Sequence, residues 1–245
     1  TDVVNKDEAD LINTYNDVSG TVTLTSVTDV LENVNALSTT DGISIATSDL
    51  KVTDVTNLSD AQDLDSYTTG EVTLDIVSDS FANVEKIYGL RPSEDGEDGV
   101  DISKATINIV ITDAVSLSQA QILDTFTTGL VTLNSVIDSF DNLIAIDKIE
   151  SNQVTMANAV VQVTDEVDLA KVNELRADTT GNITVDEVKD TKDNLAAVNA
   201  FVQEEGLAGD VILSDTEITV TDVVNKDEAD LINTYNDVSG TVTLT

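Results

Sequence analysis

The first 25 residues of this chain are repeated without a single change at its end. Residues 1–25 and residues 221–245 both read TDVVNKDEADLINTYNDVSGTVTLT. The two copies begin 220 positions apart, so the 245 residues span one period of a long repeat and the start of the next. Identity over such a length predicts an array of repeats that continues beyond both ends of this sequence.

A shorter repeat lies within the period. A Thr-Asp dipeptide ends a strand-like run at Asp2, Asp54, Asp113, Asp165 and Asp222. A Ser/Thr-Gly dipeptide precedes a second β-branched run at Gly20, Gly70, Gly129, Gly181 and Gly240. We therefore divide the chain into repeat 1 (residues 1–51), repeat 2 (52–110), repeat 3 (111–162), repeat 4 (163–219) and the start of the next identical period (220–245).

The first half of each repeat is predicted to be a strand followed by a helix of two to three turns. Apolar residues alternate in the first strand, as at Ile107, Ile109 and Ile111, which is the period of a strand with one buried face. Capping boxes then predict a helix start. The pairs with this pattern are Asn5–Glu8 and Ser116–Gln119. The glycine that follows is expected to end the helix in a left-handed conformation.

The second half of each repeat is predicted to be another strand and another short helix. An aspartate follows each second strand and is the expected helix N-cap. These aspartates are Asp29, Asp79, Asp138 and Asp190. A short third strand, such as residues 43–45 or 154–156, then leads into the next repeat. The alternation predicts an α/β fold: a repeat solenoid of parallel strands and short helices, with four repeats per period and both principal strands in one sheet. The alternative is a single globular α/β domain.

An asparagine recurs four residues after each of these aspartates. The four residues are Asn33, Asn83, Asn142 and Asn194. Asparagine is a poor helix former, yet each one directly precedes an apolar residue of the second helix. We expect the four side chains to align as a structural ladder and to bond backbone groups left unpaired at a bend. The alternative is an exposed helical asparagine without a partner.

The charge of the chain excludes several classes of partner. Its 47 acidic and 11 basic residues give a net charge of −36, which repels nucleic acid and anionic membrane. No apolar run approaches the roughly 18 residues of a membrane span. Without histidine or cysteine, catalytic triads, cysteine nucleophiles and the usual zinc sites are excluded. The aspartates recur at equivalent places, so we predict no enzyme and assign no catalytic or cofactor-binding residue.

One acidic cluster is a weak candidate for a calcium site. It comprises Glu94, Asp95, Glu97, Asp98 and Asp101, with two interspersed glycines. Calcium takes six to eight oxygen ligands, which a flexible acidic loop can supply. The spacing does not fit an EF-hand, and a solvated loop is the alternative. Calcium is therefore the one cofactor that the sequence suggests.

The motifs of this chain resemble repeats of very large bacterial proteins. The patterns that carry the resemblance are Val-Thr-Asp, QA..L...TTG and VTL..V.DSF.NL. They are similar to segments of cyanobacterial and marine bacterial secreted and cell-surface proteins of the adhesin, S-layer or haemolysin-like type. The resemblance implies an extracellular structural or adhesive role. The glycine-rich calcium-binding nonapeptide of haemolysin-type proteins is absent, so its calcium chemistry is not implied.

We therefore predict a structural repeat protein that forms a long array or filament outside the cell or on its surface. Its expected partners are copies of itself or adjoining identical repeats. One alternative is a cell-surface adhesive or glycan-binding module, with calcium as a stabilising ion; the scarcity of aromatic residues for sugar stacking counts against it. A second alternative is an acidic scaffold adapted to high salt or mineral.

Overall fold

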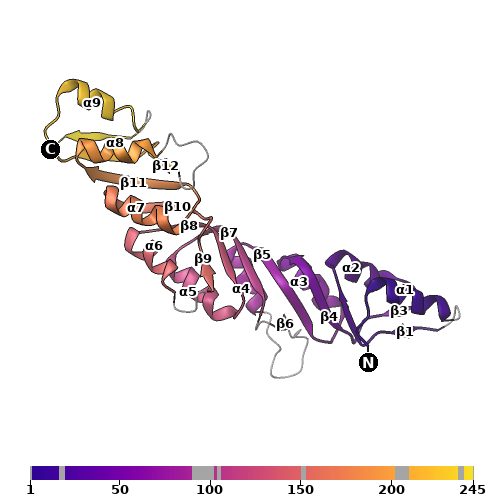
Figure 1. Ribbon diagram of the computed structural model, residues 1–245. Coiled ribbons are helices and arrows are strands. Elements are labelled where there is room, and N and C mark those ends of the chain that lie inside the picture. The colour runs from indigo at the N-terminus through magenta and orange to yellow at the C-terminus, as the bar shows by residue number, and fades with distance from the viewer. Residues whose placement is uncertain are drawn as a thin grey trace. The chain divides into compact units, whose positions relative to one another are not determined.

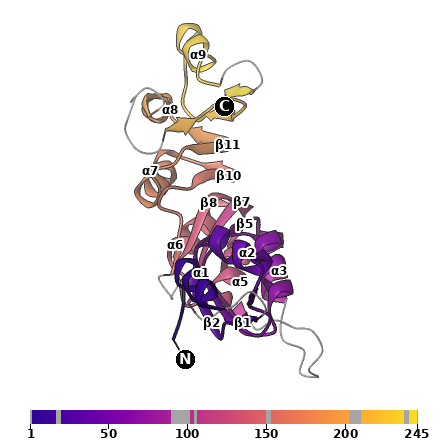
Figure 2. The same cartoon turned by 90° about the vertical axis from the view of Figure 1, so that its right-hand side faces the viewer.

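The structure is a computed structural model that describes residues 2–16, 20–89, 102–103, 106–149, 153–201, 210–236 and 240–244 (Figure 1). It divides into two compact units. Unit 1 comprises Thr1–Thr112 and Thr125–Val131, and unit 2 comprises Asp113–Asp124 and Thr132–Thr245. A second view is given in Figure 2. We describe each unit by itself.

Strands and helices alternate along the chain, as the sequence predicts. The elements before residue 107 are α1 (Lys6–Tyr15), β1 (Val22–Thr23), β2 (Ser26–Asp29), α2 (Leu31–Thr39), β3 (Ile43–Ser44), β4 (Asp49–Thr56), α3 (Leu58–Tyr67), β5 (Val72–Asp79), α4 (Phe81–Gly89) and β6 (Ile102–Ser103). Those after it are β7 (Asn108–Val115), α5 (Leu117–Phe126), β8 (Val131–Asp138), α6 (Phe140–Asp147), β9 (Val154–Thr155), β10 (Val160–Val167), α7 (Leu169–Asp178), β11 (Ile183–Asp190), α8 (Lys192–Ala200), β12 (Val211–Ile212), β13 (Glu217–Val220), α9 (Lys226–Ile232) and β14 (Val242–Leu244).

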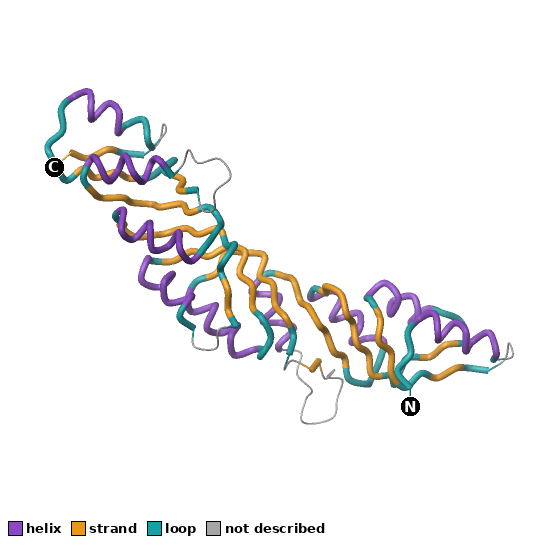
Figure 3. Tube along the Cα trace, viewed as in Figure 1, coloured by secondary structure: helices purple, strands orange, loops and turns teal. Residues whose placement is uncertain are grey.

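The fold is α/β with a large parallel sheet (Figure 3). In unit 1, β4 pairs with β5 through Leu50 and Val72, and β5 pairs with β7 through Val77 and Ile109. In unit 2, β10 pairs with β11, and β11 pairs with β13. All four pairings are parallel, which confirms that the two principal strands of a repeat join the same sheet. Helices that follow one another, such as α6, α7 and α8, contact each other beside the strands.

Neighbouring strands are staggered along their length. Val161 of β10 pairs with Ile183, whereas Ile218, its equivalent in the next repeat of the pattern, pairs with Val188. The later strand therefore starts five residues further along β11, which is roughly 16 Å at 3.3 Å per residue. Helices need about 10 Å each and strands only about 4.8 Å. This offset along the strands increases the distance between successive helices beyond the distance between the strands alone.

The core combines alternate residues of the strands with one face of each helix, such as Leu64 of α3. Ile107, Ile109 and Ile111 are all buried. Both predicted capping boxes form, because Asn5 and Ser116 each exchange hydrogen bonds with the residue three positions later. These local predictions are confirmed.

The predicted N-caps of the second helices are wrong by one residue. The cap positions are Val30, Ser139 and Thr191, whereas the aspartate before each of them ends the preceding strand. The carboxylate of each of these aspartates accepts hydrogen bonds both from the start of the preceding helix and from the residues that follow it.

Candidate functional site

The aspartate that ends a second strand caps the helix that precedes that strand. The carboxylate of Asp79 accepts three hydrogen bonds. One of its oxygens accepts the backbone N–H of Leu58 at 3.0 Å. The other accepts the N–H of Ser80 at 2.7 Å and the side-chain amide of Asn83 at 2.9 Å. Leu58 is the first residue of α3, so a carboxylate of β5 satisfies one of the unpaired donors at the start of that helix.

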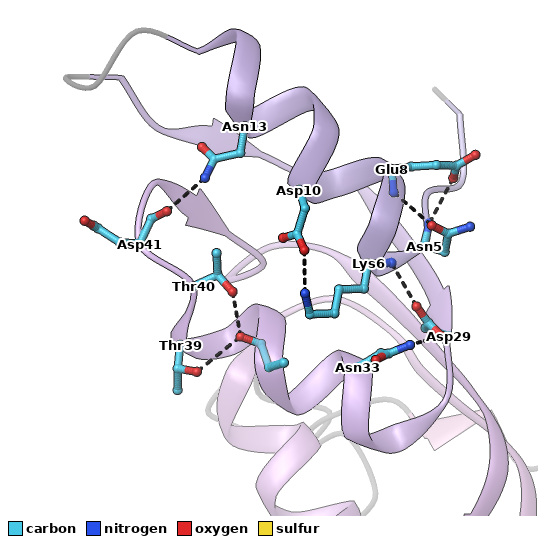
Figure 4. Close-up of polar contacts among 11 residues, drawn as sticks. Asn5, Lys6, Glu8, Asp10, Asn13, Asp29, Asn33, Thr39, Thr40 and Asp41 are labelled. Atoms are coloured by element: carbon cyan, nitrogen blue, oxygen red, sulfur yellow. Dashed lines mark hydrogen bonds and ion pairs between the residues drawn. The ribbon is translucent and has the colours of Figure 1, made fainter.

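The same arrangement recurs at the three equivalent aspartates. The backbone N–H groups that they accept are Lys6 to Asp29 at 2.8 Å, Leu117 to Asp138 at 3.0 Å and Leu169 to Asp190 at 3.0 Å. Figure 4 shows the first of these contacts, with Asp29 between the start of α1 and Asn33. A negative charge at a helix N-terminus is also favoured by the helix dipole. We call Asp29, Asp79, Asp138 and Asp190 the second-strand aspartates.

The aspartates of the Thr-Asp motif make the corresponding contact across a repeat boundary. Asp54 accepts the N–H of Leu31 at 2.7 Å. The matching contacts in unit 2 are Phe140 to Asp165 at 2.7 Å and Lys192 to Asp222 at 2.8 Å. In each case the helix belongs to one repeat and the carboxylate to the next. The first residue of each of these helices is thus held by the strand that comes after it.

The hydrogen bonds shift the ionisation of three second-strand aspartates. Burial by itself would raise the pKa of Asp29, Asp79 and Asp138. The donors around each carboxylate outweigh that cost and hold its pKa below the ordinary value, because they stabilise the charged form. These groups are therefore charged in the folded chain near neutral pH.

The four predicted ladder asparagines are partners of the second-strand aspartates. Their side-chain amides donate to the carboxylate four residues earlier, in the pairs Asn33–Asp29, Asn83–Asp79, Asn142–Asp138 and Asn194–Asp190, at 2.8–2.9 Å. The amide donates to a carboxylate rather than to the backbone groups that we expected. Alignment of the four side chains into a ladder stays a prediction.

The Thr-Thr-Gly sequence forms a second repeated contact between strands. The hydroxyl of Thr68 donates to the carbonyl oxygen of Ser48 at 2.6 Å and accepts the N–H of Gly70 at 2.9 Å. The equivalent hydroxyl contacts are Thr127 to Ile107 at 2.6 Å and Thr179 to Ala159 at 2.7 Å. All three threonines are buried, so the hydroxyl joins the end of a helix to the bend that precedes the neighbouring strand.

The glycine after these threonines is needed for a reason that we did not predict. Among the glycines described, only Gly42 has a positive φ, so the expected left-handed helix end is wrong for Gly70, Gly129 and Gly181. A Cβ at Gly181 would lie 2.0 Å from the carbonyl oxygen of Ala159. The backbones approach too closely for any side chain at this position.

Replacing Gly181 by alanine should therefore destabilise the chain by about 1–3 kcal/mol, because backbone atoms must move apart. The control is Gly20→Ala, where the added Cβ would meet the side-chain oxygen of Asn16, which can rotate away. Urea unfolding of the two variants measures the difference. Equal losses would show that a general preference for glycine, rather than the contact with Ala159, is responsible.

The predicted calcium ligands Glu94, Asp95, Glu97, Asp98 and Asp101 lie outside the described residues. Within the described ranges, no three acidic side chains gather as a metal site would require. The described helices include none that is long and apolar enough to cross a membrane. The calcium site stays a prediction.

Comparison with known proteins found no relative of this chain. No family model, curated protein or solved structure matches this chain. The resemblance to bacterial surface repeats thus stays a prediction, and the function has to be argued from the repeated contacts themselves.

Proposed function

We propose that this chain is a structural, non-catalytic repeat protein whose repeats stack as a solenoid into a long extracellular array. Four repeats form one 220-residue period, and identical periods join without interruption. Every repeat makes the same set of contacts with its neighbours. An array built from these contacts requires no bound ligand.

The observation that carries this proposal is the repeated use of the following strand to complete the preceding helix. Asp54, Asp165 and Asp222 each reach from one repeat into the one before it. The contact at Asp222 involves the second identical copy, so the period joins to its successor as its own repeats join to each other. In a stack of this kind, each added repeat contributes its own stability and a nearest-neighbour interface.

The charge supports a location outside the cell. A net charge of −36 repels nucleic acid and destabilises a compact chain through self-repulsion. High ionic strength or divalent cations screen that repulsion, and both occur in marine surroundings. Electron microscopy of material shed by the native cells tests this role. Regular fibres that react with an antibody to this chain are expected, and isolated particles only would contradict the array.

Joining two periods covalently tests the stacking directly. We expect a chain of two periods to unfold with a higher Tm, by a few °C, and with a larger urea m-value than the present chain, because a further interface is formed. Thermal and urea unfolding measure both quantities. An unchanged Tm, with the two periods unfolding independently, would show that they are separate domains and not one stack.

A further inference from the structure

Among the described residues of unit 1, the helices cover only one face of the large sheet (Figure 3). Buried residues of β4, such as Leu50 and Val52, alternate with exposed ones along the strand. The buried residues face α2 and α3, which contact β4. The exposed residues lie on the other face, which continues across β5. We call the following exposed or half-buried residues the open face of unit 1: Asp49, Lys51, Thr53, Val55, Thr73, Asp75 and Ile76.

The open face is nearly neutral although the chain is strongly acidic. Helices α1 to α4 of the same unit contain eight acidic and two basic residues. The open face has two aspartates and one lysine, and Lys51 forms an ion pair with Asp75 at 3.2 Å. The carboxylate of Asp49 accepts the backbone N–H of Glu71 at 3.1 Å. Because like charges repel, a second copy of this chain approaches the open face more favourably than the helical face.

The uncharged residues of the open face are suited to packing against another sheet. Val55 is 53% exposed, and it pairs with the half-buried Ile76 of β5. Thr53 and Thr73 are also β-branched, and such side chains pack well on a pleated surface. Two sheets that pack face to face interdigitate side chains of this kind across about 10 Å. The open face has no aromatic residue on which a sugar ring could stack, so a second sheet fits it better than a glycan does.

The ion pair makes the open face complementary to itself. Lys51 and Asp75 lie on neighbouring strands, and the side chain of each is about half exposed. A two-fold symmetric contact uses the same surface on both copies, so Lys51 of each copy can face Asp75 of the other. Unit 2 has an exposed pair of the same kind on its sheet, because Lys189 of β11 contacts Glu166 of β10 at 3.2 Å.

One open face is too small for a stable dimer. Strands β2, β4, β5 and β7 of unit 1 lie side by side, about 4.8 Å apart, and each contributes about six residues of 3.3 Å. They form an area of roughly 400 Å² on each partner, whereas a specific interface buries about 800 Å² on each. Single faces therefore associate weakly. A continuous array adds a further face with each unit, so the affinity increases with the number of periods.

We propose that arrays of this chain pair laterally, with the open faces of two copies packed against each other as two sheets. This inference rests on the proposed array, because the length of the array supplies the contact area. The partner is a second copy of the same chain. Repeats stack through the edges of their strands, so lateral pairing uses a face that the stacking leaves uncovered.

Single cysteines test the pairing, because the chain contains none. Thr53→Cys adds a thiol to the open face, and the matched control Ser66→Cys adds one at an exposed position of α3. With a flexible bifunctional maleimide, Thr53→Cys should yield at least about fivefold more cross-linked dimer of the 26.0 kDa chain than the control. In a chain of two periods, the same yield should be reached at a concentration about tenfold lower. Equal yields at the two positions would overturn the pairing.

A charge added to the open face should prevent the pairing. In analytical ultracentrifugation at high salt, the chain of two periods should form dimers, and Val55→Glu in both periods should keep it monomeric. Ile122→Glu is the matched control, since it adds the same charge at a partly exposed position of α5, and it should leave the dimers unchanged. Dimers that persist in Val55→Glu would contradict the proposal.

The same chain of two periods separates lateral pairing from the proposed array. If it unfolds as one stack and stays monomeric at every concentration, the pairing is wrong and the array stands. If the two periods unfold independently, the array itself is wrong. Retention of the monomer on insoluble cellulose, lost in Val55→Glu, would assign the open face to a neutral glycan and would also overturn the pairing.

Discussion

Replacing Asp138 by alanine should destabilise the chain by about 2–4 kcal/mol, because it removes the acceptor of three hydrogen bonds at once. The donors are the backbone N–H groups of Leu117 and Ser139 and the side-chain amide of Asn142. Hydrogen bonds to charged groups are stronger than neutral ones, and the N–H of Leu117 at the start of α5 would lose its partner. Urea unfolding at pH 7 measures the loss.

Asp63→Ala is the matched control, since it removes the same charge from an exposed position on α3. We expect a change within about 0.5 kcal/mol there. Asp138→Asn should fall between the two, because it keeps one acceptor oxygen and loses the charge. Similar values for Asp138→Ala and Asp63→Ala would mean that net charge, and not the contact with α5, sets the stability.

Acidification should first stabilise this chain and then unfold it. From pH 7 downward, protonation relieves the repulsion of an excess of carboxylates. Asp178 contributes to this rise. Its pKa is raised by burial and then by the neighbouring Asp147 and Glu174, so its charge destabilises the fold until the pH falls through that raised value.

The second phase arises from Asp29, Asp79 and Asp138, whose pKa is lowered on folding. Such groups stabilise the fold when the pH is above their pKa in the unfolded chain, which is about 3.9. That stability is lost as the pH falls through their lower pKa in the folded chain. We expect the Tm to pass through a maximum and then to drop by about 10 °C between pH 4 and pH 2. Thermal unfolding at constant ionic strength measures it.

High salt should flatten the rise of the Tm between pH 7 and pH 4 and leave the drop below pH 4, because screening removes long-range repulsion more than contacts at hydrogen-bond distance. The Asp138→Asn variant should show a smaller acid drop than the unmodified chain. A Tm that rises steadily down to pH 2 would contradict the role given to the second-strand aspartates.

The elements of the fold could be predicted because their signals are local. Alternation at Ile107, Ile109 and Ile111 marks a strand with one buried face, and Asn5 with Glu8 marks a helix start, without any knowledge of distant residues. The exact repetition of these signals also indicated that strands of the same kind pair in parallel.

The contacts between strands could not be predicted because each joins residues far apart in the sequence. Asp79 looked like the cap of the helix that follows it, and nothing local showed that Leu58 is its partner. Gly181 looked like a helix end, whereas the reason for glycine is the carbonyl of Ala159, directly before the neighbouring strand β10. Both residues recur along the chain, which indicated that they are important. The recurrence did not indicate which residues they contact.

The order of the capping contacts gives the chain a direction of assembly during synthesis. The N–H of Leu58 is capped by Asp79, 21 residues later, and that of Lys192 by Asp222, 30 residues later. Because a ribosome releases the N-terminal part first, the N–H group at the start of each such helix lacks its carboxylate acceptor until the next strand has emerged. Folding then follows translation with a lag of one strand, and the newest helix of a growing chain is always the incomplete one.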